Sequence, residues 1–467
     1  MRRIVALAAL LAGVAAPAVA QTSNNAAQSS DSGLSQTVAQ PAAPQTSAQM
    51  PAQSGVAPSV EHLFGDWWGL RPYLEDKGIY LTFDALTEFA GNVSGGVKQG
   101  STFANQVAFG ADIDWQRLAG VPGLSTHVII VNRSGANDST LFGDNLLPVQ
   151  EIYGAGGNVA LHLVSAYAQE KLFDGRLDLA AGRMNVENDF ASSPLYCNYM
   201  NNMLCGDPKA LPGGDIGHSA YPDGVWGGRV RVRPTTDTYI VTGVYEVSQG
   251  LYGNDWRTGW EFDGAQDSGV YVPVEIGYEP RLGDSNLPGH YKVGFGYDSS
   301  NTFKSFSAAL SPGVPAPTHT GNTQVWVLAD QMLLRQGPGD QDGIIVLAGF
   351  IHNDPENSVY AEQYFVGALD RGFWAARPQD TVALLFNYST VSGQLGKVQA
   401  AEQDLGLPFS NGATGVQTHE MIVEVNYNVH VYRGLSFQPD VQYVFRPKAQ
   451  SNIHNAAVFG FRANVSF

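Results

Sequence analysis

The sequence predicts an all-β protein, a transmembrane antiparallel β-barrel with a short helix before its first strand. Three observations lead to this fold class. Segments that alternate between apolar and polar residues at period two recur along the chain, and full charges stand in the middle of their polar faces. Aromatic residues gather near the segment ends, where membrane barrels carry their girdles. No run of about eighteen apolar residues is present, so an exported chain of this kind crosses lipid only as a closed barrel.

The start of the chain predicts export. Two arginines precede the apolar run IVALAALLAGVAA, and the small residues AVA stand directly before Gln21. A basic start, a short apolar region and a small-residue site are typical of a secretory signal peptide, here cleaved between Ala20 and Gln21. A retained membrane anchor is the alternative, but the run is short and rich in alanine.

Residues 21–60 are interpreted as a disordered segment. They consist mainly of Gln, Ala, Ser and Pro, and Asp31 is their only charged residue. Such a composition buries too little apolar surface to offset the entropy cost of ordering. A passive spacer and a contact with the cell wall or a partner both remain open. Residues 61–467 contain no linker and are predicted to form one domain.

The period-two pattern is clearest at the end of the chain. Counting back from Phe467, one face carries Val465, Ala463 and Phe461, and the other carries polar residues such as Arg462. The same alternation predicts further strands within residues 79–86, 103–116, 270–278, 290–298 and 423–431. A terminal strand normally frays. Closure of a barrel pairs the last strand with the first, and so holds Phe467 in an interfacial girdle.

Turn signals separate the strands and set their number. Gly95-Gly96, Asp174-Gly175 and Arg433-Gly434 are typical of turns. At about 24 residues per strand and turn, the domain holds sixteen to eighteen strands and encloses a water-filled lumen. The one helix predicted is DWWGLRPYLEDKG, with Asp66 as the cap at its start and Gly78 at its end.

The two cysteines and the net charge exclude other classes. Cys197 and Cys205 stand close together in LYCNYMNNMLC, which predicts one disulfide in an oxidising compartment. A zinc site needs more soft ligands nearby, so no metal or cofactor is predicted. The formal charge of −17 becomes −19 without the leader, because the leader holds two arginines and no acids. This charge argues against a nucleic-acid partner.

Several stretches, in order, resemble one family of outer-membrane proteins. They are LFGDWWGLRPYLEDKGI, VNRSGAN, GDN, AAGRMNVENDFASSPLYCNYMNNMLCGDP, LPGHYKVGFGYD, VLADQMLLR, RGFWAARPQDTVAL and FQPDVQYVFRP. From Leu63 onward the chain is similar to the carbohydrate-selective porins of the OprB type. Two features depart from the usual pattern: Trp68 stands where a small residue is common, and the Gln/Ala/Ser/Pro-rich lead is extra.

This resemblance implies a sixteen-stranded barrel in the bacterial outer membrane that admits sugars, such as glucose, by diffusion. It further implies that Phe467 is part of the signal read by the outer-membrane assembly machinery. The expected partners are therefore sugars, outer-membrane lipid and that machinery. The sequence leaves open whether the barrel is a monomer or a trimer, because the strand faces in lipid are apolar in both cases.

The strongest candidate for the lining of the lumen is VWGGRVRVRP. Arg229, Arg231 and Arg233 share a parity, and an arginine facing the lipid midplane costs about 2–4 kcal/mol, so the row is predicted to point inward. A planar guanidinium donates two hydrogen bonds to adjacent sugar hydroxyls. Arg233 stands next to Pro234, so a merely solvated place at a turn is an equal alternative for it.

Further charged residues are predicted to line or narrow the lumen. Arg183, Glu187 and Asp189 precede the cysteine loop, which narrows the barrel if it folds inward; a solvated surface loop is the alternative. Glu275 and Asp330 are further candidates on the wall.

Two other motifs favour a structural role. Arg377 and Asp380 are expected to pair with each other and fix a turn, and Trp67 and Trp68 are expected to pack the helix rather than stack on a sugar.

Three other functions are alternatives to sugar transport. An outer-membrane enzyme lacks support, since the sequence contains neither G-x-S-x-G nor HExxH. A porin for anions or organic acids, such as phosphate or gluconate, is motivated by the arginine row, but 43 acids outnumber 26 lysines and arginines. A structural or wall-attached barrel is suggested by residues 21–60.

Overall fold

The computed structural model describes residues 62–144, 146–153, 158–215, 217–249, 259–260, 267–310 and 318–467. The predicted signal peptide and residues 21–60 lie outside these ranges, as does Asn145 of the GDN motif. Within the ranges, no helix has the length and apolarity that a membrane crossing needs.

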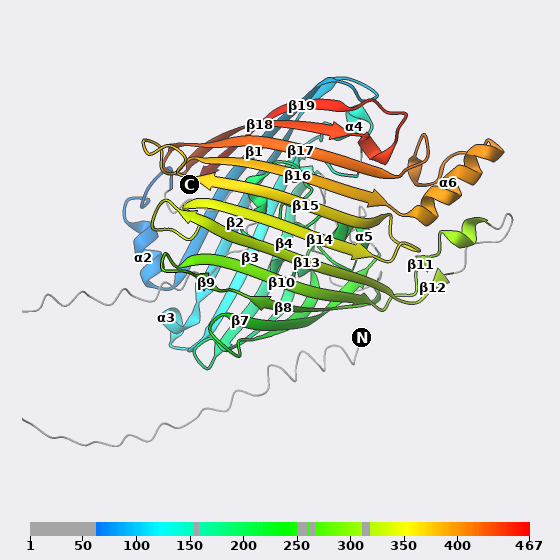
Figure 1. Ribbon diagram of the computed structural model, residues 1–467. Helices are drawn as coiled ribbons and strands as arrows, with labels where there is room; N and C mark the ends of the chain where they lie inside the picture. Colours follow the sequence, from blue (N-terminus) through cyan, green and yellow to red (C-terminus); the bar gives the residue numbers. More distant parts are fainter. Residues whose placement is uncertain are drawn as a thin grey trace, which may run out of the picture. The chain divides into compact units, whose positions relative to one another are not determined.

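Sixteen long strands among the described residues form one closed antiparallel sheet (Figure 1). They are β1 (Ile79–Ser94), β2 (Gly100–Asp114), β3 (Leu124–Gly135), β4 (Val159–Leu172), β5 (Leu177–Met184), β6 (Val225–Val232), β7 (Thr238–Ser248), β8 (Asp267–Tyr278), β10 (Leu287–Asp298), β13 (Asn322–Arg335), β14 (Gly343–Asn353), β15 (Tyr360–Arg371), β16 (Thr381–Val391), β17 (His419–Tyr432), β18 (Leu435–Phe445) and β19 (Ala456–Ser466). Each pairs with its neighbours in chain order, and β1 pairs with both β2 and β19, so the predicted barrel is confirmed. The two-residue β9 (Arg281–Leu282) pairs with the start of β10, and β11 (Phe303–Lys304) pairs with β12 (Thr318–His319).

Closure holds the last residue of the chain. Ser466 lies opposite Asp84 in the β1–β19 ladder, and the Phe467 N–H donates to the carbonyl of Phe83 at 2.9 Å. The rings of Phe83 and Phe467 lie 4.9 Å apart. The terminal residue is therefore ordered by pairing with the first strand, as the sequence predicted.

The strands carry apolar side chains on the outside of the barrel and polar side chains on the inside, the reverse of a water-soluble β-barrel. On β8, the apolar Val274 and Ile276 point outward and are exposed, whereas Tyr271 and Glu275 point inward and are buried. An outward apolar band facing lipid and an inward polar face around a lumen are the pattern of membrane barrels. The alternation therefore follows from a lipid exterior and a polar interior.

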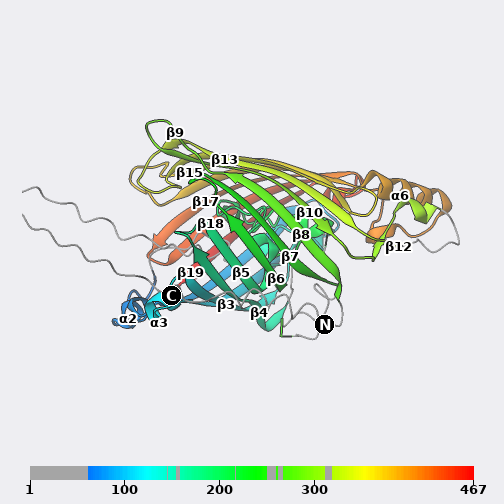
Figure 2. The same ribbon diagram turned by 90° about the horizontal axis from the view of Figure 1, so that it is seen from below.

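The two ends of the barrel differ in the length of their connections. One end carries short turns, such as Asp174–Gly175 and Arg433–Gly434, together with α2 (Leu70–Asp76), α3 (Trp115–Ala119) and the C-terminus (Figure 2). The other end carries the long connections, including residues 136–158 and 185–224. In outer-membrane barrels, short turns face the periplasm and long loops face the outside. The end with the short turns is therefore the periplasmic end.

The remaining helical segments lie in the connections. They are α4 (Ser139–Phe142), α5 (Ala210–Gly214), α6 (Gly393–Leu405) and the short 3-10 turns η1 (Glu151–Tyr153), η2 (Val186–Asn188), η3 (Tyr196–Asn198), η5 (Ser307–Leu310), η6 (Ser410–Gly412) and η7 (Pro447–Ala449).

The predicted first helix exists, but its predicted start was wrong. α2 begins after Gly69, whose φ is 90°, and Asp66 provides no side-chain cap; the Asp66 carbonyl accepts from the N–H groups of Gly69 and Arg71 instead. A thirteen-residue helix, α6, was missed. Its signals are readable: the Ser392 hydroxyl caps the first turn, and Gly406 ends the helix at φ 65°.

Candidate functional site

Residues 185–224 connect β5 to β6 and are called the inward loop here, because their described residues, 185–215 and 217–224, fold into the barrel. Its backbone reaches opposite walls, since the Ala191 N–H donates to Glu275 on β8 and the Met200 N–H donates to Glu424 on β17. Its apolar side chains, such as Phe190 and Leu204, are fully buried. A loop that spans the lumen narrows the path through it, as the sequence predicted for a loop that folds inward.

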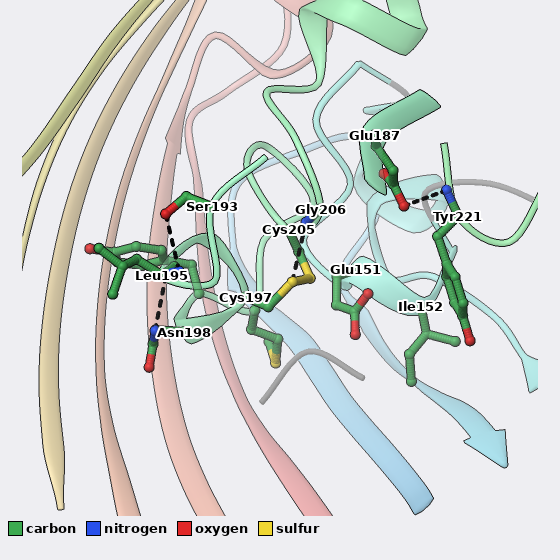
Figure 3. Close-up of a disulfide and its surroundings, with 12 residues drawn as sticks. Glu151, Ile152, Glu187, Ser193, Leu195, Cys197, Asn198, Cys205, Gly206 and Tyr221 are labelled. Atoms are coloured by element: carbon green, nitrogen blue, oxygen red, sulfur yellow. Dashed lines mark hydrogen bonds between the residues drawn. A yellow bond between two sulfur atoms is a disulfide. The ribbon is translucent and has the colours of Figure 1, made fainter. Parts of the chain in front are cut away.

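A disulfide joins Cys197 and Cys205 within the inward loop (Figure 3). The Cys197 sulfur accepts a hydrogen bond from the N–H of Gly206 at 3.2 Å, and the Asn198 amide donates to the carbonyl of Leu195 at 2.9 Å. Figure 3 shows Glu151, from the neighbouring loop between β3 and β4, beside this disulfide. The tip of the inward loop is therefore cross-linked inside the barrel.

Carboxylates on the wall hold the two loops by their backbone N–H groups. Glu275 accepts from Ala191 N at 2.8 Å, and Glu424 accepts from Met200 N at 2.6 Å. On β1, Glu88 accepts from Ile152 N at 3.2 Å. These carboxylates accept hydrogen bonds from the loop backbones. Part of the negative charge of this acidic chain therefore holds the loops and does not face solutes in the lumen.

Arg462 on β19 is the matching cation on this wall. Its side chain is completely buried and donates to the carbonyls of Cys197 and Tyr199, at 2.8 and 2.9 Å, and to Glu88 at 3.0 Å. The guanidinium thus ties the disulfide-bonded tip to the seam where the barrel closes. From the sequence, Arg462 was predicted to lie on the polar face of the last strand, and no role was predicted for it.

The arginine row on β6 points into the lumen, and its charges are matched. Arg229 is buried between Asp178 on β5, at 2.6 Å, and Asp189 of the inward loop, at 2.9 Å. Arg231 pairs with the same Asp189 at 3.2 Å and lies 5.2 Å from the centre of the Tyr239 ring. Arg229, Arg231 and Asp189 are therefore brought together.

Arg233 extends the row at the periplasmic end. It pairs with Glu279 at 2.8 Å and lies over the same Tyr239 ring, 5.5 Å from its centre. Both members of this pair are partly exposed.

A second hydrogen-bonded group lies on β2, β3 and β4. Asp112 bonds to His127 Nδ1, and Ser125 Oγ lies 2.9 Å from His127 Nε2. The ring of Tyr167 stacks on His127 with centres 4.7 Å apart. Hydrolases use the same three residue types, Ser, His and Asp, together with backbone N–H groups that stabilise an oxyanion. Here Ser125 lies within the β2–β3 and β3–β4 ladders, so the backbone N–H groups of this described segment are engaged in strand pairing and are not available for that role. The group is suited to hydrogen bonding, not to nucleophilic attack.

Gln169 joins these two groups into one surface. Its amide donates to both carboxylate oxygens of Asp178, at 2.9 and 2.8 Å, and Asp178 in turn holds Arg229. We call the resulting surface the polar band, defined by Asp112, Ser125, His127, Tyr167, Gln169, Asp178, Asp189, Arg229 and Arg231. The band crosses five neighbouring strands and combines hydroxyl, amide, guanidinium and aromatic groups, the groups that bind a polyol.

The other predicted residues lie apart from this band. Arg183 is fully buried opposite Trp226 and donates through Nε to the carbonyl of Leu163 at 3.2 Å. Glu187 is buried and accepts from Tyr221 N at 2.6 Å. Burial raises the pKa of Glu187 well above its usual value, and Asp207 nearby raises it further.

Glu275 and Asp330 lie on the wall as predicted, but both hold the inward loop. Besides Ala191, Glu275 accepts from the Tyr239 hydroxyl and from Trp326 Nε1, each at 2.7 Å. Asp330 accepts from Ser193 at 3.4 Å and bonds to His290 at 2.6 Å. Their first role is thus to position the loop.

The two structural predictions had different outcomes. Arg377 and Asp380 pair with each other in the turn before β16, as expected. Trp67 packs against Arg71, whose guanidinium lies 4.1 Å from the ring centre. The packing role expected for Trp68 is wrong, because its side chain is 98 % exposed.

The described residues hold no group of three or more His, Cys, Asp or Glu side chains arranged for a metal ion.

Most of the polar band was not predicted from the sequence. The strand containing Asp112 was predicted, but the bond between Asp112 and His127, and the placement of Tyr167 and Asp178 on the next two strands, depend on strand order and register. Only the inward parity of each residue was readable from the sequence.

The comparisons with known proteins agree with this geometry. Residues 98–467 match the family model described as carbohydrate-selective porin, OprB family. Porin B of Pseudomonas aeruginosa is 27 % identical over 434 residues, which cover 89 % of this chain and 93 % of that protein. The putative porin QuiX of Acinetobacter baylyi is 27 % identical over 420 residues, covering 87 % and 93 %.

A solved structure has the same fold. The high-pH structure of Pseudomonas putida OprB superposes with a TM-score of 0.80 at 26 % identity and covers 88 % of this chain and 99 % of that one. The match includes the sixteen-stranded barrel and confirms the predicted fold. The protein is a non-enzymatic channel of the outer membrane, and the chain belongs to the OprB family of carbohydrate-selective porins.

Proposed function

We propose that this porin admits glucose and related sugars to the periplasm by passive diffusion, and that Arg231 is the principal solute contact. The observation that carries the proposal is the state of Arg231. Its side chain is 23 % exposed and pairs with Asp189, while its Nη1 has no hydrogen-bond partner among the described residues. Arg231 therefore offers a solute the N–H groups of Nη1, while Asp189 compensates its positive charge.

Matched charges favour a neutral polyol over an ion. Asp178 and Asp189 compensate Arg229 and Arg231, so the field at the band is weak while hydrogen-bonding capacity remains. A sugar exchanges its water for such donors, and the partly exposed Tyr167 ring offers a face for its C–H groups. Binding of this kind is favourable enough to recruit a solute and weak enough to release it.

A porin for organic acids or other anions is the second candidate, and Lys292 is the observation that favours it. Lys292 points inward from β10 and donates to the carbonyl of Ser192. Among the described residues it pairs with no carboxylate. An uncompensated cation beside the inward loop would attract an anion. A structural or wall-attached barrel remains the third candidate and rests on residues 21–60 alone.

The test is solute flux into liposomes that contain the refolded protein, with glucose, a disaccharide, gluconate and phosphate compared. We expect glucose to enter faster than its size alone predicts, and Arg231→Ala to slow glucose more than phosphate. Arg281→Ala is the matched control, since Arg281 pairs with Asp340 in an exposed periplasmic turn. Arg229→Ala is the weaker probe, because removing Arg229 leaves the buried Asp178 without its cation, and the loss then disturbs the wall as well as the solute path. Flux that favours gluconate and falls in Lys292→Ala would support the anion porin, and no flux through folded protein would support a structural role.

The proposed function as an outer-membrane porin also makes expectations for the two ends of the chain. We expect a cleaved signal peptide before Gln21 and recognition of Phe467 by the assembly machinery. Both are tested by N-terminal sequencing and by Phe467 deletion, respectively.

A further inference from the structure

The periplasmic rim carries an exposed apolar surface that the channel function does not use. Four side chains form it, and we call them the rim patch: Phe64, Trp68, Leu70 and Tyr73. Each is more than half exposed, and Trp68 is 98 % exposed. A tryptophan in this state buries none of its large apolar area, which is unusual for the residue.

The rim patch is held in a fixed position. Arg71 is buried beneath α2, where Nη1 donates to the carbonyl of Leu81 at 3.1 Å and Nη2 to the carbonyl of Phe467. Trp67 and Trp68 have φ values of 52° and 57°, the left-handed region that bulky residues rarely adopt. The backbone therefore turns Trp68 outward through a strained conformation, while Trp67 packs on Arg71.

The rim patch continues the lipid-facing wall of the barrel. Phe83 points outward from β1, on the face opposite to Asp84, and its ring lies 4.9 Å from that of Phe467. The Phe467 ring lies 5.4 Å from the Phe64 ring. Three aromatic rings thus lead from the lipid-facing strand to the segment that carries Trp68. The patch adjoins the membrane surface, not the lumen.

We propose that the rim patch docks into the periplasmic leaflet of the outer membrane, at the boundary between lipid headgroups and acyl chains. Tryptophan and tyrosine prefer this boundary, because one part of each ring is apolar and the other hydrogen-bonds to water. A short helix with such residues lies in the plane of the interface. Anchored there, α2 clamps the β1–β19 seam to the membrane through Arg71 and the C-terminus.

The chain allows a clean test because its two cysteines form the disulfide. A nitroxide attached to Trp68→Cys, in protein reconstituted into phospholipid liposomes, reports its surroundings through collisions with oxygen and with a water-soluble nickel chelate. Val293→Cys, on the outward face of β10, is the lipid control. Leu405→Cys, exposed at the end of α6, is the water control.

At position 68 we expect the ratio of oxygen to nickel accessibility to lie several-fold above that at position 405, and closer to that at position 293. A label at Leu70→Cys should give the same result if Trp68→Cys refolds poorly. A ratio equal to that at position 405 would overturn the proposal, because the patch would then face water. Protection from both reagents would also overturn it, because another protein segment would then cover the patch.

Discussion

The Asp189 carboxylate lies 3.2 Å from Arg231 Nη2, which joins the inward loop to the arginine row of the wall. The same oxygen lies 2.9 Å from Arg229 Nε. One loop carboxylate therefore compensates two wall cations. The position of the loop sets both the width of the lumen and the charge that a solute meets there.

We expect Asp189→Asn to make the channel more selective for anions. Removing the carboxylate leaves Arg231 uncompensated beside the path. One unit charge at about 6 Å in a water-like medium is worth about 0.7 kcal/mol, and its loss favours chloride and disfavours potassium by that amount each, so the chloride-to-potassium permeability ratio should rise about tenfold. The reversal potential in a salt gradient across a planar bilayer measures this ratio. Asp340→Asn, in an exposed periplasmic turn, is the control and should leave the ratio unchanged.

Arg462→Met should destabilise the barrel strongly. The substitution keeps an apolar stem but leaves Glu88 buried without its cation and two loop carbonyls without a donor. Breaking a buried ion pair costs about 3–5 kcal/mol. Urea unfolding followed by tryptophan fluorescence measures the loss, and adding Glu88→Gln should recover part of it. Arg281→Ala, in an exposed turn, should unfold like the wild type.

Replacing both cysteines by serine should loosen the tip of the inward loop without opening the barrel. A disulfide that closes a loop of this size contributes about 2–3 kcal/mol by limiting the unfolded chain. The carbonyl bonds from Arg462 remain, so the tip stays near β19. Single-channel recordings should show noisier conductance of similar mean. A doubled mean conductance would show that the disulfide alone keeps the loop inside.

The barrel could be predicted from the sequence because the pattern that produces it is visible within each strand. A lipid exterior and a polar interior force alternation on every strand, and that alternation is visible residue by residue, as in Val274 and Glu275. The parity of Arg229 and Arg231 was predictable for the same reason. Closure followed from the need to pair every backbone group in lipid.

The use of the charged residues was not predictable in the same way. Glu275 accepts a hydrogen bond from Ala191 only because the inward loop crosses the lumen. That loop follows β5, which lies about ninety positions before Glu275 in the sequence. Asp112 and His127 become partners only through the β2–β3 register. The exposure of Trp68 was not predictable either, because it depends on the left-handed backbone at Trp67 and Trp68, which the sequence does not show.

The loop between β3 and β4 should be more stable at mildly acidic pH. Burial raises the pKa of Asp144 to about 6, against an ordinary value near 3.8. The folded state therefore binds a proton more tightly than the unfolded state does, so the free energy of unfolding rises as the pH falls from about 7 to about 4. Hydrogen exchange of residues 136–149 between pH 4.5 and 8, corrected for intrinsic rates, measures this. Asp144→Asn should reduce the pH dependence, and Asp138, whose pKa burial also raises to about 6, should account for part of what remains.

Asp340 provides a control of opposite sign. The hydrogen bond and charge of Arg281 lower the pKa of Asp340 despite some burial, so its contribution weakens as the pH falls. If Asp340→Asn removed the acid stabilisation and Asp144→Asn did not, our assignment to Asp144 would be wrong.

Substitutions of Glu275 should separate its charge from its role as an acceptor. Its two oxygens accept from three donors, Ala191 N, Tyr239 Oη and Trp326 Nε1. In Glu275→Gln, the amide oxygen still faces Ala191 and Trp326, and the amide nitrogen donates to the Tyr239 hydroxyl, which also accepts. We expect this variant to keep the conductance and sugar selectivity of the wild type.

Glu275→Ala should instead release the inward loop. It leaves donors without an acceptor, at about 1–3 kcal/mol for each buried group, and frees Ala191, whose φ of 56° is held in place by the contact. The loop then moves off β8, the lumen widens, and a disaccharide should gain more flux than glucose. The ratio of sucrose to glucose flux in liposomes measures this change. An unchanged ratio in Glu275→Ala, with the barrel folded, would mean that Glu424 and Arg462 are sufficient to hold the loop.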